Sequence, residues 1–554
     1  MKPITIKGIQ KHALVNGRVR TMDPANSLAQ AVLIAGERIE CVGSTQDVLA
    51  AAGNGCVVTD LEGQALFPGF IDTHSHLSMY SVWSEQVYCG AEAGSLAGVL
   101  ARLRERAEKS PPGALVMGWG FDDSILPENR GPTRKELDSV SAVHPILLVH
   151  ISVHACYVNS IALRQANLRA GSDIQGGEVV PDENGEALGL LLETAAFTAM
   201  DALCPRPTPE SLRRALTKGM SDYNAYGITA THEAGIGLGG IDPTMHMRVL
   251  RDMEKDGRLS LRLYLSFMPE AFEKYAAVGL QTGFGSKMVT FCGPKLFNDG
   301  AIQAYTAALS QPYHDRPDCC PDVLVPVEKI TEDLVRYHSA GYQIAYHGNG
   351  DAGIEVMISA IEKAQKICPR KDPRHIIVHC QTASDAQLTR MKAAGIVPTF
   401  YGLHVWYYGD RHYERFLGPE RASRLDPSGS AVRLGLRHSL HADSPVMPPW
   451  TLRSIHTAVH RTTRKGRLLG GDQRISVEEA VRAYTSHAAW FQFAEHERGS
   501  IEPGKLADFV LLSEDLMTME PERIADVSVR MTMTGGRIVY SRQISSHLKQ
   551  YGQR

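Results

Sequence analysis

The sequence of 554 residues contains no long apolar run, no paired-cysteine motif and no excess of one charge. No segment approaches the ~20 consecutive apolar residues of a membrane-spanning helix, and the first residues, Met1-Lys2-Pro3-Ile4-Thr5, do not resemble a secretory signal. None of the ten cysteines is arranged as CxxC, which argues against a structural zinc knuckle. We therefore expect a cytoplasmic protein with reduced thiols that does not bind membranes.

The composition is that of an ordinary globular protein. Hydrophobic residues make up 43% of the chain and charged residues 21%, and the formal net charge is −3. Because binding to nucleic acid needs a basic surface, we expect no nucleic-acid partner. The length exceeds that of a single small core, so it predicts a large domain with an accessory domain.

Both ends of the chain are rich in short β-strands. Near the N-terminus, Asn16-Gly17 lies between strand-like residues and predicts a hairpin, and residues 31–34 and 39–42 predict a second one. Near the C-terminus, residues 507–512 predict a strand and residues 531–540 a hairpin. Because chain termini often lie close together, we expect residues 1–65 and 499–554 to form one composite β-sandwich domain.

Between these ends, residues 66–498 alternate apolar strands with amphipathic helices, which is typical of an α/β fold with a parallel sheet. The eight candidate strands are Ala65–Ile71, Gly227–His232, Leu261–Phe267, Val289–Phe297, Tyr342–His347, His375–His379, Gly395–Phe400 and Ser439–Ala442. Eight strands predict a (β/α)₈ TIM-like barrel. The long interval after the first strand predicts an insertion over about residues 80–215, placed above the C-terminal face of the barrel.

A metal-binding pattern follows the first predicted strand. His74 and His76 lie in the run Pro68-Gly69-Phe70-Ile71-Asp72-Thr73-His74-Ser75-His76. Alternate residues of a strand point the same way, so the two histidines can hold one metal ion. An isolated HxH is more often a pair of polar loop residues, but the apolar lead-in favours a ligand pair at a strand end.

Four further residues lie at or near the ends of later predicted strands: Lys295, His347, His379 and Asp443. A single histidine at a strand end is usually structural, and a single lysine is usually a solvated charge. Barrel enzymes, however, assemble their sites from the C-terminal ends of several strands. The set therefore predicts a centre for one or two divalent metal ions, with zinc as the first candidate.

Several segments resemble the amidohydrolase superfamily, and within it the amidohydrolase-3 branch of YtcJ-like proteins and N-substituted formamide deformylases. The resemblance covers nearly the whole chain. It rests on residues 68–76, 118–123 (GWGFDD), 159–163 (NSIAL), 295–300 (KLFNDG), 347–351 (HGNGD), 441–445 (HADSP) and 499–508 (GSIEPGKLAD). The first and last of these segments are the most specific to the superfamily.

The resemblance implies roles for the candidate ligands. His74, His76 and Asp443 would bind one ion, His347 and His379 a second, and Lys295, as a carbamate formed with CO₂, would bridge them. Water bound to such an ion ionises near pH 7, and Asp443 would act as the general base. The resemblance further implies hydrolysis of a small N-substituted amide or formamide, and a homodimer. A lysine paired with Asp299 or with a carboxylate of the insertion is the structural alternative to the bridge.

Seven residues lie in segments that can reach the C-terminal face and are candidates for substrate binding. They are Trp119, Phe121, Asp122, His154, Tyr313, His404 and Trp406. Their aromatic rings would suit an apolar or aromatic N-substituent. Asp122-Asp123 is also compatible with the N-cap of a helix.

Two other functions have to be weighed. Mononuclear deaminases of amino-heterocycles share the HxH, a later histidine and the aspartate, but they usually place a glutamate shortly after the mid-barrel histidine. Here His347 is followed by Gly348-Asn349-Gly350-Asp351, with no glutamate until Glu355. A non-catalytic barrel scaffold would be expected to have lost ligands, whereas all six are present.

Overall fold

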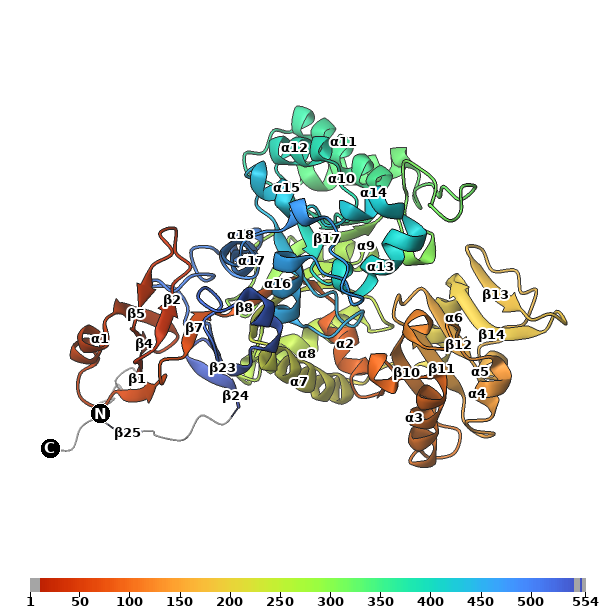
Figure 1. The fold of residues 1–554 in the computed structure, drawn as a ribbon, viewed down its shortest axis with the longest axis horizontal. Coiled ribbons are helices and arrows are strands. Elements are labelled where there is room, and N and C mark those ends of the chain that lie inside the picture. Colours follow the sequence, from red (N-terminus) through yellow and green to blue (C-terminus); the bar gives the residue numbers. More distant parts are fainter. Residues whose placement is uncertain (1–9, 543–548, 551–554) are drawn as a thin grey trace.

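A computed structural model of the protein describes residues 10–542 and 549–550. Figure 1 shows three parts side by side: β-sheets built from both chain ends, a central barrel, and the region between residues 87 and 203. No helix among the described residues combines the length and the apolar character needed to cross a bilayer.

The barrel is an eight-stranded parallel sheet in the order β21-β20-β19-β18-β17-β16-β15-β8. Its strands are β8 (Phe70–Ser75), β15 (Ile228–Ile236), β16 (Arg262–Phe267), β17 (Val289–Phe297), β18 (Ala345–Gly348), β19 (His375–His379), β20 (Ile396–Tyr401) and β21 (Ser439–His441). The sheet curls until its last strand meets its first, where the N–H of Asp443 donates to the carbonyl of His74 at 3.2 Å. The predicted barrel fold is therefore confirmed.

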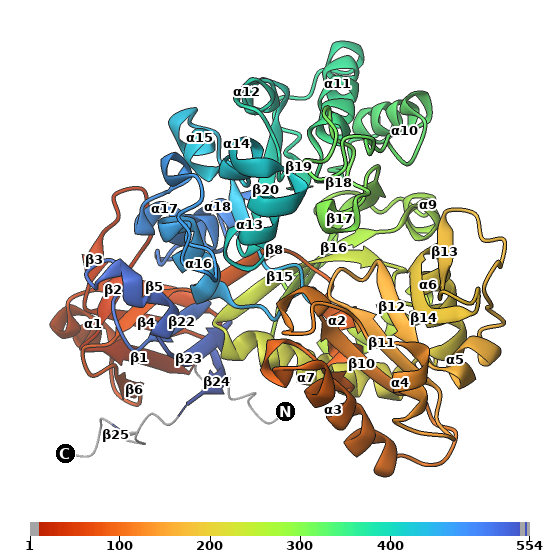
Figure 2. The same cartoon turned by 45° about the vertical axis from the view of Figure 1, so that its right-hand side comes forward.

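Helices surround the barrel (Figure 2). They include α2 (Leu77–Trp83), α7 (Pro209–Ala225), α8 (Pro243–Lys255), α9 (Pro269–Ala276), α10 (Val327–Ser339), α11 (Asp351–Ile367), α12 (Asp385–Ala394), α14 (Gly418–Ser423), α15 (Ser428–Arg433), α16 (Thr451–His460), α17 (Val477–Ala483) and α18 (Ser486–Phe491). Helix α7 begins as expected, because the side chain of Thr208 accepts from the N–H of Ser211 and Pro209 occupies the first turn.

The first predicted strand, Ala65–Ile71, is in fact divided at Gly69. Residues Ala65–Pro68 (β7) pair with β22 (Phe509–Leu512) in a different sheet, and the barrel strand begins only at Phe70. A Cβ at Gly69 would lie 2.2 Å from Oγ1 of Thr229, so only glycine allows the chain to pass this close to the second barrel strand. As a result His74 lies inside a barrel strand and not beyond its end.

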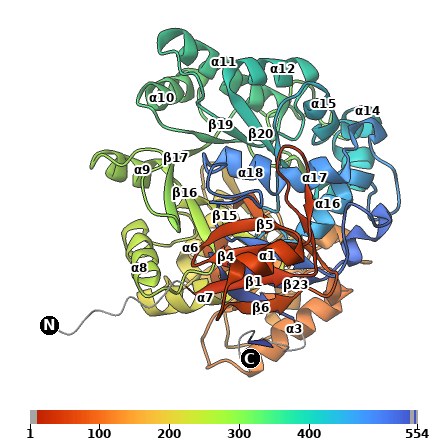
Figure 3. The same ribbon diagram turned by 90° about the vertical axis from the view of Figure 1, so that its left-hand side faces the viewer.

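The chain ends contribute two sheets that face each other (Figure 3). One has the order β25-β6-β1-β4-β5 and the other β24-β23-β22-β7-β2-β3. Their remaining strands are β1 (Lys11–Val15), β2 (Arg18–Arg20), β3 (Leu28–Ala29), β4 (Ala31–Ala35), β5 (Arg38–Gly43), β6 (Val57–Asp60), β23 (Val529–Thr534), β24 (Arg537–Ser541) and β25 (Lys549–Gln550); helix α1 spans Thr45–Ala52. Apolar side chains from both sheets, among them Leu14, Leu66 and Phe509, pack between them.

The Asn16-Gly17 hairpin prediction was wrong. Strand β1 pairs with β4 and β6, whereas β2 pairs with β3 and β7, so the turn carries the chain from one sheet to the other. A Cβ on Gly17 would meet Leu61 at 2.5 Å. The hairpins β4–β5 and β23–β24 form as predicted. We propose that the two sheets form one composite domain.

The inserted region contains its own sheet in the order β13-β14-β12-β11-β10-β9. Its elements are β9 (Val87–Tyr88), α3 (Leu96–Glu108), β10 (Val116–Phe121), α4 (Arg134–Asp138), β11 (Ile146–His150), β12 (Ala155–Val158), α5 (Ser160–Gln165), β13 (Gly177–Pro181), β14 (Ala187–Glu193) and α6 (Thr194–Leu203). Strands β9, β10 and β11 are parallel, so the ends of β10 and β11 bring Phe121 and His150 together.

Candidate metal centre

His74, His76 and Asp443 converge at the C-terminal end of the barrel. His74 is in β8, His76 directly follows that strand, and Asp443 follows β21. The Nε2 atoms of His74 and His76 lie 3.3 and 3.5 Å from Oδ1 of Asp443. One potential ligand atom from each residue lies within 4.8 Å of the other two, which is the arrangement a metal ion requires.

These three groups lack the hydrogen bonds that would otherwise explain their closeness. Oδ1 of Asp443 and the Nδ1 atoms of His74 and His76 have no hydrogen-bond partner among the described residues. Burial lowers the pKa of His76 to about 4 and that of His74 well below its ordinary value, so both rings are neutral at pH 7. Neutral imidazole and ionised carboxylate are the forms that bind metals, so the residues fit a divalent ion.

Asp72 fixes the backbone around this cluster. Its buried Oδ1 accepts the N–H of His74 at 3.1 Å and that of Ala442 at 3.4 Å. Burial raises the pKa of Asp72 to about 8, and the two backbone hydrogen bonds oppose that rise. The side chain thus ties the first barrel strand to the residues that precede Asp443. This role of Asp72, two residues before His74, was not predicted from the sequence.

Lys295 lies next to the cluster on β17 and is fully buried. Its Nζ is 3.5 Å from Nε2 of His74 and 4.8 Å from the ring centre of Phe297. Nζ forms no salt bridge with a described carboxylate; Asp299 instead accepts the N–H of Gly350 at 2.7 Å. Burial lowers the pKa of Lys295 to about 7, while Asp443 opposes the fall. A neutral amine is therefore well populated at neutral pH.

His379 and His347 complete the predicted set on neighbouring strands. Nε2 of His379, at the end of β19, lies 3.9 Å from Oδ2 of Asp443. The ring centre of His347, on β18, is 4.6 Å from that of His379. Burial lowers the pKa of His347 to about 3 and that of His379 well below its ordinary value. Both rings are therefore neutral and available as ligands.

The polar neighbours of His347 lie around Nε2. This atom is 3.1 Å from Nδ2 of Asn349, 3.3 Å from the carbonyl of Gly300 and 3.6 Å from Oδ1 of Asp299. When Nε2–H donates to Gly300, the lone pair is on Nδ1, and that atom is left to bind a metal. Gly300 and Asp299 belong to the Lys295–Gly300 segment, so this segment supplies both a buried lysine and the partner of a histidine.

Three residues near the cluster were not predicted. His441 is fully buried, with its ring centre 5.1 Å from that of His74 and 5.0 Å from that of His379, and neither of its nitrogens has a partner among the described residues. Nε2 of His232 lies 2.7 Å from Oγ of Ser266. The hydroxyl of Tyr401 is buried and unpaired. The alternation of His441 with Asp443 repeats that of His74 with His76, a signal that could have identified it.

The four predicted substrate residues of the insertion occupy different environments. Trp119 packs against Tyr88 with ring centres 4.8 Å apart, and Phe121 is buried in the core of the insertion. Asp122 caps the turn that follows β10, as the N-cap alternative expected, and pairs with Arg411 at 2.9 Å. His154 bonds Glu193 at 2.8 Å and contributes to the lowered pKa of His347 after burial and Lys295.

The three predicted substrate residues of the barrel also differ. Tyr313 is buried and accepts the N–H of Ala307 at 3.2 Å. Trp406 lies between the guanidinium groups of Arg453 and Arg464, at 5.1 and 5.5 Å from its ring centre. His404 lies beside the metal centre, with its ring 6.2 Å from that of His379.

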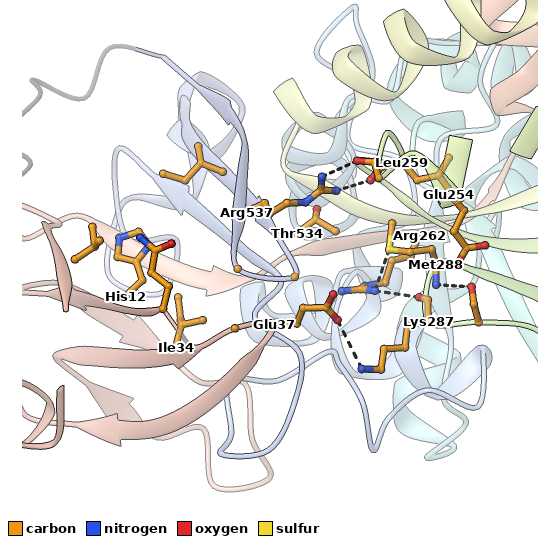
Figure 4. Close-up of a pocket in the computed structure, with 18 residues that line it drawn as sticks. His12, Ile34, Glu37, Glu254, Leu259, Arg262, Lys287, Met288, Thr534 and Arg537 are labelled. Carbon is orange, nitrogen blue, oxygen red and sulfur yellow. Dashed lines mark hydrogen bonds and ion pairs between the residues drawn. The ribbon is translucent and has the colours of Figure 1, made fainter. Parts of the chain in front are cut away.

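A large cavity lies away from this centre, between the composite sheets and the barrel (Figure 4). It has a volume of about 960 Å³. Several of its charged groups have protein partners: Arg262 pairs with Asp508, Lys287 pairs with Glu37, and Arg537 donates to backbone carbonyls. No cluster of potential metal ligands was found among its described residues.

The fold and the cluster of neutral histidines with a carboxylate define a metal-dependent hydrolase built on a barrel. The amidohydrolase family model matches residues 57–540, and the chain therefore belongs to the amidohydrolase family. It is a hydrolytic enzyme that acts on carbon–nitrogen bonds and uses a divalent metal ion.

Two curated proteins are similar along most of their length. N-substituted formamide deformylase of Arthrobacter pascens is 29% identical over 96% of this chain and 98% of its own. Putative amidohydrolase YtcJ of Bacillus subtilis is 28% identical over 87% of this chain and 90% of its own. The crystal structure of an uncharacterised metal-dependent hydrolase from Pyrococcus horikoshii has a TM-score of 0.75 at 24% identity, covering 92% of this chain and 99% of that chain.

Proposed function

We propose that the enzyme hydrolyses the C–N bond of a small N-substituted amide, with formamides as the first class to test and zinc as the native ion. The observation that carries this proposal is the convergence of His74, His76 and Asp443 beside a buried Lys295. The similarity to a formamide deformylase supports the choice of substrate. In this proposal His347 and His379 hold a second ion.

A bound divalent ion supplies Lewis acidity and makes water a stronger nucleophile near neutral pH. Asp443 takes the proton of the attacking water and passes it to the leaving nitrogen, because a neutral amide needs both a nucleophile and a protonated leaving group. Its Oδ1 accepts no hydrogen bond from the described residues, so the carboxylate can accept that proton. Asp72 holds Asp443 in place through the N–H of Ala442.

Lys295 has a separate role in this proposal. Its neutral amine attacks the carbon of CO₂ and loses one proton, and the product is a carbamate whose two oxygens can bridge two cations. The lowered pKa of Lys295, about 7, favours the neutral amine that this reaction needs. A carbamate also adds a negative charge among neutral histidines, which suits a pair of divalent ions.

The substrate would enter between the insertion and the barrel, where His154, His404 and Asp122 lie. Four further residues remain predicted to bind the substrate: Trp119, Phe121, Tyr313 and Trp406. In the structure they contact protein side chains or backbone. A small-molecule substrate and a homodimer remain part of the proposal.

The test is a panel of formamides, longer amides, carbamates, lactams and amino-heterocycles with zinc-loaded enzyme. Release of an acid and a substituted amine from a formamide or amide, lost after chelation and restored by zinc, is the expected result. Reaction of amino-heterocycles alone, with ammonia as the product, would instead assign the protein to the deaminases. Full hydrolysis by protein shown to be free of metal would overturn the proposal.

A further inference from the structure

The seventh barrel strand places a histidine beside the metal centre that the ligand set does not use. His404 begins the π-helical turn His404–Tyr408, just after β20 ends at Tyr401. Its ring centre is 4.4 Å from that of Tyr401 and 6.2 Å from that of His379. π-Helical turns are rare and often occur at functional sites.

Asp426 determines which nitrogen of His404 carries the proton. Oδ1 of Asp426 lies 3.0 Å from Nδ1 of His404, and the two side chains are only 7% and 6% exposed. Because an ionised carboxylate can only accept, Nδ1 carries the proton and Nε2 keeps its lone pair in the neutral ring. Nε2 makes no hydrogen bond to any described residue. The pair therefore presents an acceptor that has no protein partner.

Asp426 is itself held rigidly. Its N–H donates to the carbonyl of Gln381 at 2.9 Å, close to the end of the strand that carries His379. Its carbonyl accepts from the buried Arg461 at 3.2 Å, and Arg461 also donates to the carbonyl of Leu425 at 2.7 Å. This anchoring fixes the direction of His404, as second-shell carboxylates commonly do for imidazoles.

We propose that His404, oriented by Asp426, selects N-monosubstituted amides by accepting their N–H at Nε2. The inference rests on the proposed amide hydrolysis and adds the substrate class. In that reaction Asp443 takes the proton of the attacking water, and divalent ions held by the cluster would supply Lewis acidity toward the carbonyl. The amide N–H is then the one donor of the reacting group without a partner. Esters and N,N-disubstituted amides lack this hydrogen, so they leave a desolvated acceptor unpaired, which disfavours them.

The experiment compares N-cyclohexylformamide with N-cyclohexyl-N-methylformamide on zinc-loaded wild type, Asp426→Asn, His404→Ala and the double variant. Asparagine tolerates the backbone conformation of Asp426, whose φ is +46°. Its side-chain amide, unlike the carboxylate, does not hold His404 in one tautomer. Wild type should favour the monosubstituted formamide in kcat/KM by about ten-fold or more. Each variant should reduce that ratio to about two-fold or less, with no further loss in the double variant and with unchanged zinc content.

The matched control is Asp385→Asn, which removes an exposed ion pair with Arg424 and should keep the full preference. A preference that survives in Asp426→Asn overturns the inference. If wild type hydrolyses neither formamide, the proposed function fails on its own. The two compounds are then compared by calorimetry as ligands. Tighter binding of the N–H compound that depends on Asp426 supports the inference, and equal binding overturns it.

Discussion

Two clusters of buried charge lie at opposite ends of the barrel, and they are built in opposite ways. Between the barrel and the composite sheets, Arg262 donates to both oxygens of Asp508 at 2.7 and 2.9 Å, and the N–H of Gly535 donates to Asp508 as well. Although burial opposes it, Arg262 holds the pKa of Asp508 below its ordinary value. In this cluster each carboxylate oxygen has a partner.

The cluster at the other end is almost as buried but is not satisfied. Lys295 has no carboxylate partner within 4.0 Å among the described residues, and Oδ1 of Asp443 accepts no hydrogen bond. Unpaired buried polar groups cost about 1–3 kcal/mol each, so a folded protein retains them where a ligand completes the site. The difference indicates which charges hold the fold together and which ones serve chemistry.

The largest expected effect is the loss of activity without loss of stability when the proposed metal ligand His76 is removed. His76→Ala should abolish hydrolysis and lower the bound metal. The thermal midpoint of the metal-free variant should stay close to that of metal-free wild type, because the ring makes no hydrogen bond with the part of the chain that the structure describes. Elemental analysis, activity assays and calorimetry check this. Full activity of the variant in a preparation verified to lack metal would contradict it.

Lys295→Ala should lose nearly all activity and one of two equivalents of metal, because the proposed bridging carbamate cannot form. Formate or acetate at high concentration should restore part of both. In the wild type, reconstitution with bicarbonate and zinc should be faster above pH 7 than below it, because the neutral amine of Lys295 predominates above its pKa of about 7. An unmodified ammonium in a fully metallated crystal grown with bicarbonate would contradict the bridge.

Asp508→Ala addresses the satisfied cluster. It leaves Arg262 buried and unpaired, so the free energy of unfolding should fall by about 3–5 kcal/mol. Metal content and kcat of the folded fraction should stay unchanged, since Asp508 is not among the ligands. Chemical denaturation gives the first quantity and assays at low temperature the second. A loss of metal without a loss of stability would reverse the comparison.

Asp443→Asn keeps the shape of the carboxylate and removes its basicity. We expect the variant to retain much of its metal, to lose kcat by about 10²-fold or more, and to change KM less. Steady-state kinetics and elemental analysis of the variant test these expectations, and a variant with wild-type kcat would remove Asp443 from the mechanism.

The smallest effect is expected at the surface. Asp385→Asn breaks the exposed pair with Arg424 and should change the free energy of unfolding by no more than about 1 kcal/mol, because water screens the pair. If this substitution lowered the free energy of unfolding as much as Asp508→Ala does, burial would not explain the difference between the Asp385–Arg424 and Asp508–Arg262 pairs.

Sequence patterns predicted the barrel and placed the candidate ligands on its strands because both depend on local alternation along a strand. His379, for example, ends a five-residue apolar strand, and the strand begins and ends where predicted. Patterns could not show that the chain changes sheet at Asn16-Gly17 or at Gly69, because strand partners far along the chain decide both points. Nor could they pair His404 with Asp426, which depends on how the segments after β19 and β20 pack.

The pairing of β7 with β22 has a consequence for how the protein is made. Phe67 and Val510 face each other in that ladder, yet several hundred residues separate them in synthesis order. At about 5–20 residues per second, the edge of β7 waits roughly twenty seconds to a minute and a half on the ribosome before its partner emerges. During that time Leu66 and Phe67, both fully buried in the finished fold, have no strand to cover them on that side. The edge of β7, which leads directly into the strand of His74, is therefore open to aggregation until β22 has been made.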